Sequence, residues 1–242
     1  QYEENPYPRW VNLGLSYKPE TISKVVKDAK LKLSNVDITS VDTPDILIAG
    51  CGTGQHSIGT AYRFKDSKVL AIDLSLTSLA YAKRKTQQLG FHNIDYMQAD
   101  ILKLNKLDRQ FDLIESSGVL HHMDDPMAGW RVLVDCLKPG GIMKIGLYSE
   151  LARQPVVKFR ADIAQSGSAP TKSNIRAMRE RIIASEDGLS KELRSWNDFY
   201  SMSELRDLIF HAQEHRFTLP QIKDCLKQLG LQFCGFEADQ IV

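Results

Sequence analysis

Apolar residues in this chain occur either in short continuous runs or at helical spacing, and the two patterns alternate from residue 45 to residue 148. Short apolar runs bounded by polar residues predict buried strands, and apolar positions three and four apart predict helices. The expected strands are DILIAG, KVLAID, NIDYMQ, FDLIES and IMKIGLY, the expected helices cover 55–65, 75–90 and 126–137, and LKPGG is expected as a tight turn. This alternation predicts an α/β, Rossmann-like fold with a doubly wound, mostly parallel sheet.

Beyond residue 149 the helical spacing continues without strands, which predicts a helical subdomain inserted into the sheet domain. Ser201 and Glu204 form an S-x-x-E capping box at one helix start. The apolar stripe of that helix predicts that it docks on the sheet domain. The run LQFCGFE at 231–237 predicts one late strand. The expected helices cover about 151–165 and 173–184, a stretch from 201, and a stretch from 220 to near 230.

These elements divide the chain into four expected regions. They are an N-terminal arm and helix over 1–44, a core sheet domain over 45–149, a helical lid or acceptor subdomain over 150–230, and a late strand over 231–242. The arm has no steady period, and we expect it to pack through its aromatic residues Tyr2, Tyr7 and Trp10.

Composition narrows the classes of function. The 242 residues are 43% hydrophobic and 25% charged, as in ordinary globular proteins. With 31 Lys and Arg against 30 Asp and Glu, the net charge of +1 argues against a dedicated nucleic-acid binder, although small RNA contacts stay open. No apolar run reaches the roughly 20 residues of a membrane helix. Scattered cysteines without a CxxC pair, and no signal peptide, predict a reduced, cytoplasmic protein.

The strongest chemical pattern is the glycine-rich turn GCGTG at 50–54, which directly follows the first strand. Such a turn lets backbone N–H groups at a helix start approach a ligand closely. The next strand ends in Asp73, about 20 residues on, where a carboxylate can accept from ribose hydroxyls. The third strand ends near Asp100 and Ile101, which suit an adenine amino group and ring. Either aspartate could instead only cap the element that follows it.

Five segments in this order resemble the class I S-adenosylmethionine-dependent methyltransferases: DILIAGCGTG, VLAIDLS, YMQADI, FDLIESSGVLHHMDDP and LKPGG. The resemblance implies S-adenosyl-L-methionine as the cofactor. It also implies methyl transfer to an unidentified acceptor, a small molecule or a protein side chain. The implied cofactor contacts are Gly50, Cys51, Gly52, Gly54, Gln55, Asp73, Leu74, Asp100, Ile101, Ser116 and Ser117. We interpret the cysteine among them as a backbone contact and not as a nucleophile.

His121 and His122 follow the fourth strand, in the region that lies beside the transferred methyl in this family. Either imidazole is a candidate base, with His121 the first choice, and either could instead be packed or solvent-exposed. Together with Asp124 and Asp125 the pair could bind a divalent metal, but adjacent residues on a helix do not face each other, so we predict no metal. Tyr148 is a candidate acceptor contact.

The string His211-Ala212-Gln213-Glu214-His215 spells H-x-x-E-H, the order found in one class of zinc proteases. On a helix, His211 and His215 would share one face. A zinc site also needs a third ligand, and no protease domain surrounds this string. We therefore predict no zinc here, and expect both histidines to contact the acceptor or neighbouring helices.

The flanks carry a narrower resemblance. YEENPYPRW, LYSELAR and DFYSMSELRDLIFHAQEHRFTLPQI are similar to a bacterial methyltransferase group in which this domain follows tetratricopeptide repeats, so an N-terminal repeat domain is a possible partner in a longer protein. Two alternatives stay open. One is a non-catalytic module that binds S-adenosylmethionine. The other is a nicotinamide oxidoreductase, whose usual GxGxxG differs from the Gly54-Gln55 sequence here.

Overall fold

The structure, a computed structural model, describes residues 3, 6–8, 10–15, 18–34, 37–210 and 214–237. Its strands are β1 (Asp45–Ala49), β2 (Lys68–Asp73), β3 (Ile94–Gln98), β4 (Phe111–Ser117) and β5 (Leu137–Gly146). The helices of the first half are α1 (Ile22–Asp28), α2 (Gln55–Arg63), α3 (Leu76–Gln88) and α4 (Pro126–Asp135). Those of the second half are α5 (Gln154–Ser166), α6 (Lys172–Ala184), α7 (Gly188–Arg194), α8 (Met202–Phe210) and α9 (Leu219–Gln228). Short 3₁₀ turns are η1 (Asp37–Ser40), η2 (Ile101–Leu107), η3 (Leu120–His122) and η4 (Asn197–Phe199).

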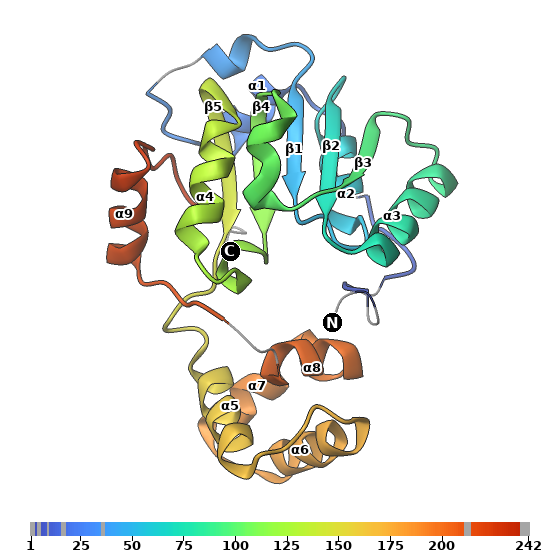
Figure 1. Ribbon diagram of the computed structural model, residues 1–242, viewed down its shortest axis with the longest axis vertical. Helices are drawn as coiled ribbons and strands as arrows, with labels where there is room; N and C mark the ends of the chain where they lie inside the picture. Colours follow the sequence, from blue (N-terminus) through green and yellow to red (C-terminus); the bar gives the residue numbers. More distant parts are fainter. Residues whose placement is uncertain are drawn as a thin grey trace.

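The five strands form one sheet in the order β3-β2-β1-β4-β5, and every pairing is parallel (Figure 1). Strands β2 and β3 extend to one side of β1, whereas β4 and β5 extend to the other. The chain therefore changes direction across the sheet between β1 and β4, which is where open α/β sheets bind ligands at the strands' carboxyl ends. The predicted Rossmann-like, doubly wound sheet is confirmed.

Helices cover both faces of the sheet, and successive residues of each strand point to opposite faces. Ile46 and Ile48 of β1 pack in one cluster with α1 and α2, while Leu47 packs in the other with Trp130 of α4. Burial on both faces explains why the strands are continuous apolar runs in the sequence. No helix in the described part of the chain is long and apolar enough to cross a bilayer.

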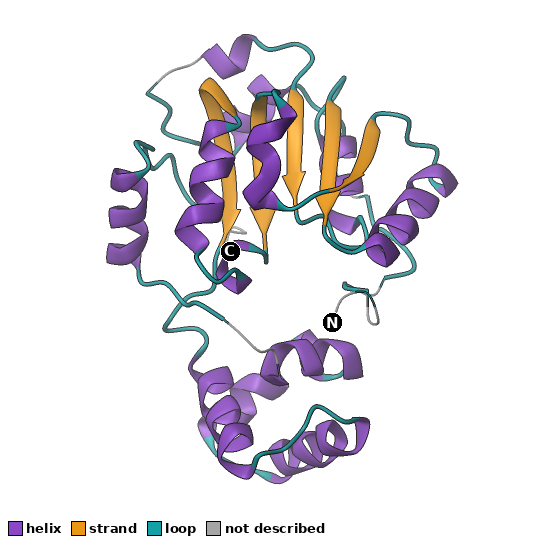
Figure 2. Ribbon diagram, viewed as in Figure 1, coloured by secondary structure: helices purple, strands orange, loops and turns teal. Residues whose placement is uncertain are grey.

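Helices α5 to α8 form a separate group that faces the carboxyl ends of the strands, and Figure 2 draws this group as helix and loop alone. The group has its own apolar core, drawn from all four helices and from η4. Leu205, Leu208 and Ile209 of α8 are buried in that core and not against the sheet. The prediction that the apolar stripe of this helix docks on the sheet domain is therefore wrong, because neighbouring helices cover the stripe.

The end of the chain also differs from the prediction. α9 packs with the sheet layer, through Cys225 in the cluster beneath α4, although the sequence grouped it with the helical subdomain. Residues 231–237 form no strand in the structure as described, so the predicted late strand is not found there. Gly235 has φ +151° and the rings of Phe233 and Phe236 lie 4.8 Å apart. A regular strand would hold residues three apart on opposite faces.

The LKPGG segment lies inside β5 and is not a separate turn before it. Phe111 of β4 pairs with Leu137, but Leu113 pairs with Ile142, so the segment between them bulges out of register. Gly140 within the bulge has φ +77°, a left-handed conformation that glycine adopts without strain.

Candidate functional site

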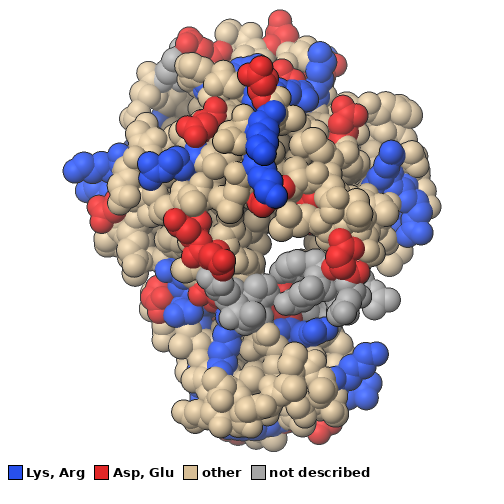
Figure 3. All heavy atoms as spheres, in the orientation of Figure 1, with Lys and Arg blue, Asp and Glu red and all other residues tan. Residues whose placement is uncertain are grey.

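A cavity of about 1000 Å³ lies at the carboxyl ends of the strands, between the sheet and α8. Figure 3 shows a hollow between the sheet domain and the helices α5 to α8, with acidic side chains to its left and right. Most of the predicted site residues line this cavity: Gly50, Cys51, Gly52, Gln55, Asp73, Leu74, Asp100, Ile101, Ser117, His122 and Tyr148. Gly54, Ser116, His121 and His215 do not line it, and His211 lies outside the described residues.

Two glycines of the turn are required by close contacts within the chain itself, before any ligand is considered. Gly52 has φ +51°, and a Cβ added there would lie 2.4 Å from the carbonyl oxygen of Tyr7. Gly54 has φ +89°, and a Cβ there would lie 2.6 Å from the Cβ of Ala82 on α3. The second glycine therefore serves the packing of α2 against α3, while the first allows the N-terminal arm to approach the turn.

Asp73 joins the glycine turn to the start of α3. Its Oδ2 accepts a hydrogen bond from Gly52 N (2.8 Å), and its Oδ1 accepts one from Ser75 N (2.9 Å). A carboxylate oxygen has two lone pairs, so each oxygen can accept one more hydrogen bond. The cap role and the ribose role that the sequence left open are therefore compatible with each other.

The other candidate cofactor residues have distinct surroundings. Asp100 Oδ1 accepts from Leu102 N (3.0 Å), so this residue caps η2 while also lining the cavity. Ser116 is buried, and its hydroxyl donates to Ala49 O (3.0 Å) inside the sheet. Burial raises the pKa of the Cys51 thiol, and the nearby Asp73 charge acts in the same direction. The thiol therefore stays protonated, in line with a backbone contact and not a nucleophile.

The N-terminal arm folds over the glycine turn. Thr53 N donates to Tyr7 O (3.1 Å), Thr53 Oγ1 donates to Pro8 O (2.5 Å), and the Trp10 indole donates to Thr53 Oγ1 (3.0 Å). Tyr7 and Pro8 consequently line the cavity. Trp10 is buried and its ring contacts that of Tyr81, so the expected packing is found for Trp10, whereas Tyr7 meets the turn through its backbone carbonyl. Tyr2 lies outside the described residues.

The two adjacent histidines have different environments. His121 is 1% exposed, and its ring stacks on Tyr148 at 3.7 Å between centroids and 27° between planes. His122 lines the cavity, with its ring 4.3 Å from that of His121. Burial raises the pKa of the Tyr148 hydroxyl, and the charge of Arg153 opposes that rise. The structure thus favours His122 over His121 as the histidine that can reach a bound molecule.

The side chain of Glu214, in the H-x-x-E-H string, is fully buried among arginines. Arg153 Nε donates to its Oε1 (3.2 Å), a second Arg153 nitrogen bonds its Oε2, and Arg160 lies 3.3 Å from Oε2. Glu214 and His215 lie in irregular chain after α8, and His215 N donates to His121 O (2.7 Å). The described residues contain no group of three side chains suited to hold a metal ion.

Sequence reasoning missed His56, which lines the cavity from the first turn of α2. Its Nε2 lies 2.8 Å from Glu115 Oε2, and Thr60 Oγ1 donates to the same oxygen (2.5 Å). Burial alone would raise the pKa of Glu115, but the bonds from His56 and Thr60 and the charge of Lys144 bring it below its ordinary value. The position of His56, two residues after the glycine turn, is the one signal in the sequence.

Sequence reasoning also missed Asp207. This residue projects from the polar side of α8 and lines the cavity opposite the strands. Its negative charge contributes to the raised pKa values of Tyr7 and Tyr148, after burial, which is the larger cause for both. Only the placement of α8 across the sheet edge brings this carboxylate to the site, so no local pattern could have found it.

Comparisons with known proteins agree with this geometry. Residues 46–141 match the family described as "Methyltransferase domain". The chain is 30% identical over 201 residues to an uncharacterized protein of Synechococcus sp., covering 80% of this chain and 48% of that protein. It is 31% identical over 122 residues to phosphoethanolamine N-methyltransferase 1 of Arabidopsis thaliana, covering 50% of this chain and 24% of that protein.

Among solved structures, PKMT2 from Rickettsia typhi in complex with AdoHcy has a TM-score of 0.65 and 18% identity, and covers 92% of this chain and 44% of that one. This likeness concerns the fold. The chain spans about half the length, or less, of the relatives that it matches. Residues 46–141 therefore match a methyltransferase domain family and carry a Rossmann-like sheet, and this family match supports S-adenosylmethionine as the cofactor. None of these matches bears on tetratricopeptide repeats, and that association stays a prediction.

Proposed function

We propose that this chain transfers a methyl group from S-adenosylmethionine to an amine, in the cavity between the sheet edge and α8. The observation that carries the proposal is one cavity lined both by the glycine turn with Asp73 and by His122, Tyr148 and Asp207. A methyl donor and an acceptor must meet in a single space from which water is excluded.

The residues on the sheet side fit the cofactor. Asp73 and Asp100 each keep acceptor capacity beyond their backbone bonds, which suits ribose hydroxyls and an adenine amino group. Ile101 offers an apolar surface for the adenine ring. When bound, the cofactor supplies an activated methyl on a sulfonium, so the protein's part is to bind, orient and exclude water.

The charges around the cavity favour a cationic or neutral acceptor over an anionic one. Among the described residues that line it, the acidic and basic ones are the aspartates Asp73, Asp100, Asp124, Asp125 and Asp207 and one lysine, Lys144. That lysine is ion-paired with Glu237. The resulting negative potential attracts an ammonium group and opposes a carboxylate. An amine is also the methylated group that the name of the Arabidopsis relative implies.

An amine must be neutral before its nitrogen attacks the methyl carbon, so an ammonium proton has to leave first. A neutral His122 imidazole on the cavity wall could accept that proton. His56 is a second candidate, because it lines the cavity and the buried carboxylate of Glu115 holds its Nε2 atom. Tyr7 and the arm would cover the reacting atoms.

The test has a cofactor part and an acceptor part. Calorimetry with S-adenosylhomocysteine and with NAD should give binding for the first alone, and binding of NAD alone would reject the methyltransferase. Labelled methyl transfer should then be assayed with phosphoethanolamine, a lysine-containing peptide and malonate. We expect label in an amine. Label in malonate but in neither amine would overturn the acceptor class.

The variant Asp207→Asn sharpens the acceptor part. Loss of one carboxylate facing the acceptor should raise the KM for the amine roughly tenfold, which corresponds to ~1.4 kcal/mol. Affinity for S-adenosylhomocysteine should not change. The matched control is Asp162→Asn, which removes a carboxylate from the same group of helices where it pairs with the exposed Arg181.

A further inference from the structure

The glutamate of the H-x-x-E-H string sits at the joint between the sheet domain and the helices. The side chain of Glu214 is fully buried, and both its oxygens are engaged by the guanidinium of Arg153, at the start of α5. Arg160 of α5 adds a second cation 3.3 Å from Oε2. Two-pronged contact of this kind fixes the plane of a guanidinium as well as its position.

The plane of that guanidinium matters because it lies on an aromatic ring of the cavity wall. The central carbon of Arg153 is 3.8 Å from the ring centre of Tyr148. The same tyrosine ring stacks on His121 at 3.7 Å, and His121 in turn contacts the ring of His122. A continuous series of contacts therefore runs from Glu214 to the two cavity residues Tyr148 and His122.

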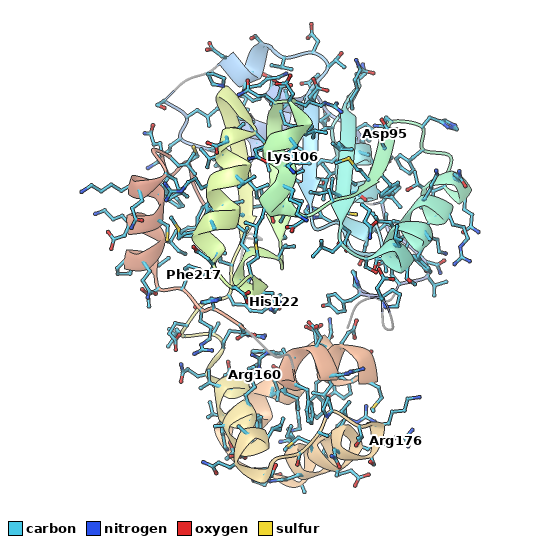
Figure 4. All side chains as sticks on the ribbon, in the orientation of Figure 1. Asp95, Lys106, His122, Arg160, Arg176 and Phe217 are labelled. Carbon is cyan, nitrogen blue, oxygen red and sulfur yellow. The ribbon has the colours of Figure 1, made fainter. Side chains whose placement is uncertain are left out.

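Backbone hydrogen bonds join the two segments that connect the sheet domain to the helices α5 to α8, namely the segment after β5 and the segment after α8. Phe217 N donates to Tyr148 O (2.8 Å), and Glu150 N donates to Phe217 O (3.0 Å). His215 N donates to His121 O (2.7 Å). Figure 4 shows His122 and Phe217 at this joint, with Arg160 on the helices that face them. The segment with Glu214 is thus held against the strand end that carries Tyr148.

We propose that Glu214 is a positioning residue: it holds the Arg153 guanidinium over the ring of Tyr148, and so keeps the tyrosine stacked on His121 and sets the acceptor-side wall of the cavity. The inference rests on the proposed function, because an acceptor contacts this wall only if the chain transfers a methyl group in this cavity. Without the carboxylate, Arg153 and Arg160 repel each other in a buried site, and Arg153 has to move toward solvent. Tyr148 then loses the surface that keeps its ring in place.

The first readout is spectroscopic and needs no substrate. In the native chain, the ring current of Tyr148 should shift the His121 imidazole protons upfield of those of the other five of the six histidines. Glu214→Gln, which keeps the shape but removes the charge, should abolish at least half of that shift. Glu186→Gln, on an exposed ion pair of the same helices, is the control and should leave it unchanged.

The second readout separates positioning from general damage. In Glu214→Gln the dissociation constant for S-adenosylhomocysteine should stay within twofold, whereas the KM for the phosphoethanolamine or lysine-peptide probe should rise about tenfold or more, as displaced contacts do. Glu214→Asp should recover part of the His121 shift and reverse part of the rise in KM, because a carboxylate is again present. An unmoved His121 signal in folded Glu214→Gln, or an equal loss of S-adenosylhomocysteine binding, would overturn the inference.

A third variant covers the case in which Glu214→Gln does not fold. Arg153→Lys keeps the buried charge pair but removes the planar group that rests on Tyr148. It should fold and still lose the His121 shift, and an unchanged shift would overturn the inference. Failure of the proposed function would look different, because the unaltered chain would then not bind S-adenosylhomocysteine while the His121 shift remained measurable.

Discussion

The sheet domain and the helices α5 to α8 build their interiors in different ways, and the cavity lies where the two meet. The sheet domain buries strands on both faces, so its apolar residues form continuous runs. The helical group buries one stripe of each helix in a core of its own. Its polar sides therefore remain for the cavity, as Asp207 of α8 shows.

This difference assigns different tasks to the two sides of the cavity. Backbone turns and strand-end carboxylates dominate the sheet side, and their geometry is rigid because the sheet fixes every strand end. On the acceptor side, the cavity residue Tyr148 lies against Arg153, which is ion-paired with Glu214 of the opposing segment. Changes at the glycine turn, Asp73 or Asp100 should therefore affect the cofactor, and changes at Asp207 or Glu214 should affect the acceptor.

The largest effect is expected for Gly52→Val. The new Cβ would meet the Tyr7 carbonyl at 2.4 Å, and a branched residue is strained at φ +51°. We expect S-adenosylhomocysteine binding to weaken more than about a hundredfold, equivalent to ~2.7 kcal/mol. Gly59→Ala, inside α2 with open space at its Cβ, is the control and should bind normally. Normal binding by Gly52→Val would mean that the turn does not approach the cofactor.

Asp73→Asn should come next. Losing charge-assisted hydrogen bonds, each worth about 1.5–3 kcal/mol, should weaken S-adenosylhomocysteine roughly tenfold to a hundredfold. Calorimetry measures the change, and Asp95→Asn on the exposed side of β3 is the control. Should the dissociation constant of Asp73→Asn stay the same, the carboxylate would serve only the turn and the start of α3.

The Glu115 site predicts a pH dependence of stability within the sheet domain. The pKa of Glu115 is lower in the folded chain than its ordinary 4.5, so ionised Glu115 stabilises the fold above about pH 4.5. That contribution disappears as the pH falls through the lowered folded value. Glu115→Gln should lose about 1–3 kcal/mol at neutral pH and fall less steeply below pH 4.5 in denaturant titrations. Parallel curves for both proteins would contradict the ionised state.

The smallest effects test whether the two interiors are separate. Thr171 caps α6 in the helical group, and Thr218 caps α9, which packs with the sheet layer. Replacing either threonine with alanine should lower the free energy of unfolding by ~1 kcal/mol. Hydrogen exchange should quicken in α6 alone for Thr171→Ala, and in α9 with α4 for Thr218→Ala. Faster exchange throughout the sheet in Thr171→Ala would show that the two bodies unfold as one.

The fold of the sheet domain could be predicted because each strand has a recognisable apolar run in the sequence. Five apolar runs matched β1 to β5, and the helices between them began and ended within a few residues of the prediction. The errors lie where a local pattern competed with tertiary contacts. The stripe of α8 suits any apolar partner, and α5 and α6 supplied it. The run at 231–237 has a strand-like pattern, but Gly235 has φ +151° and the described segment forms no strand.

The sequence by itself determined the sheet side of the site, since the glycine turn, Asp73 and Asp100 are tied to strand ends whose meeting at one edge follows from parallel pairing. Only the tertiary structure decided the rest. In the folded chain His121 is buried, whereas His122 lines the cavity. His56 contacts Glu115, and Asp207 lies opposite the strands. Those residues are far apart along the chain or lie on a helix whose partner no local pattern specifies, and their roles depend on how two separate cores come to face each other.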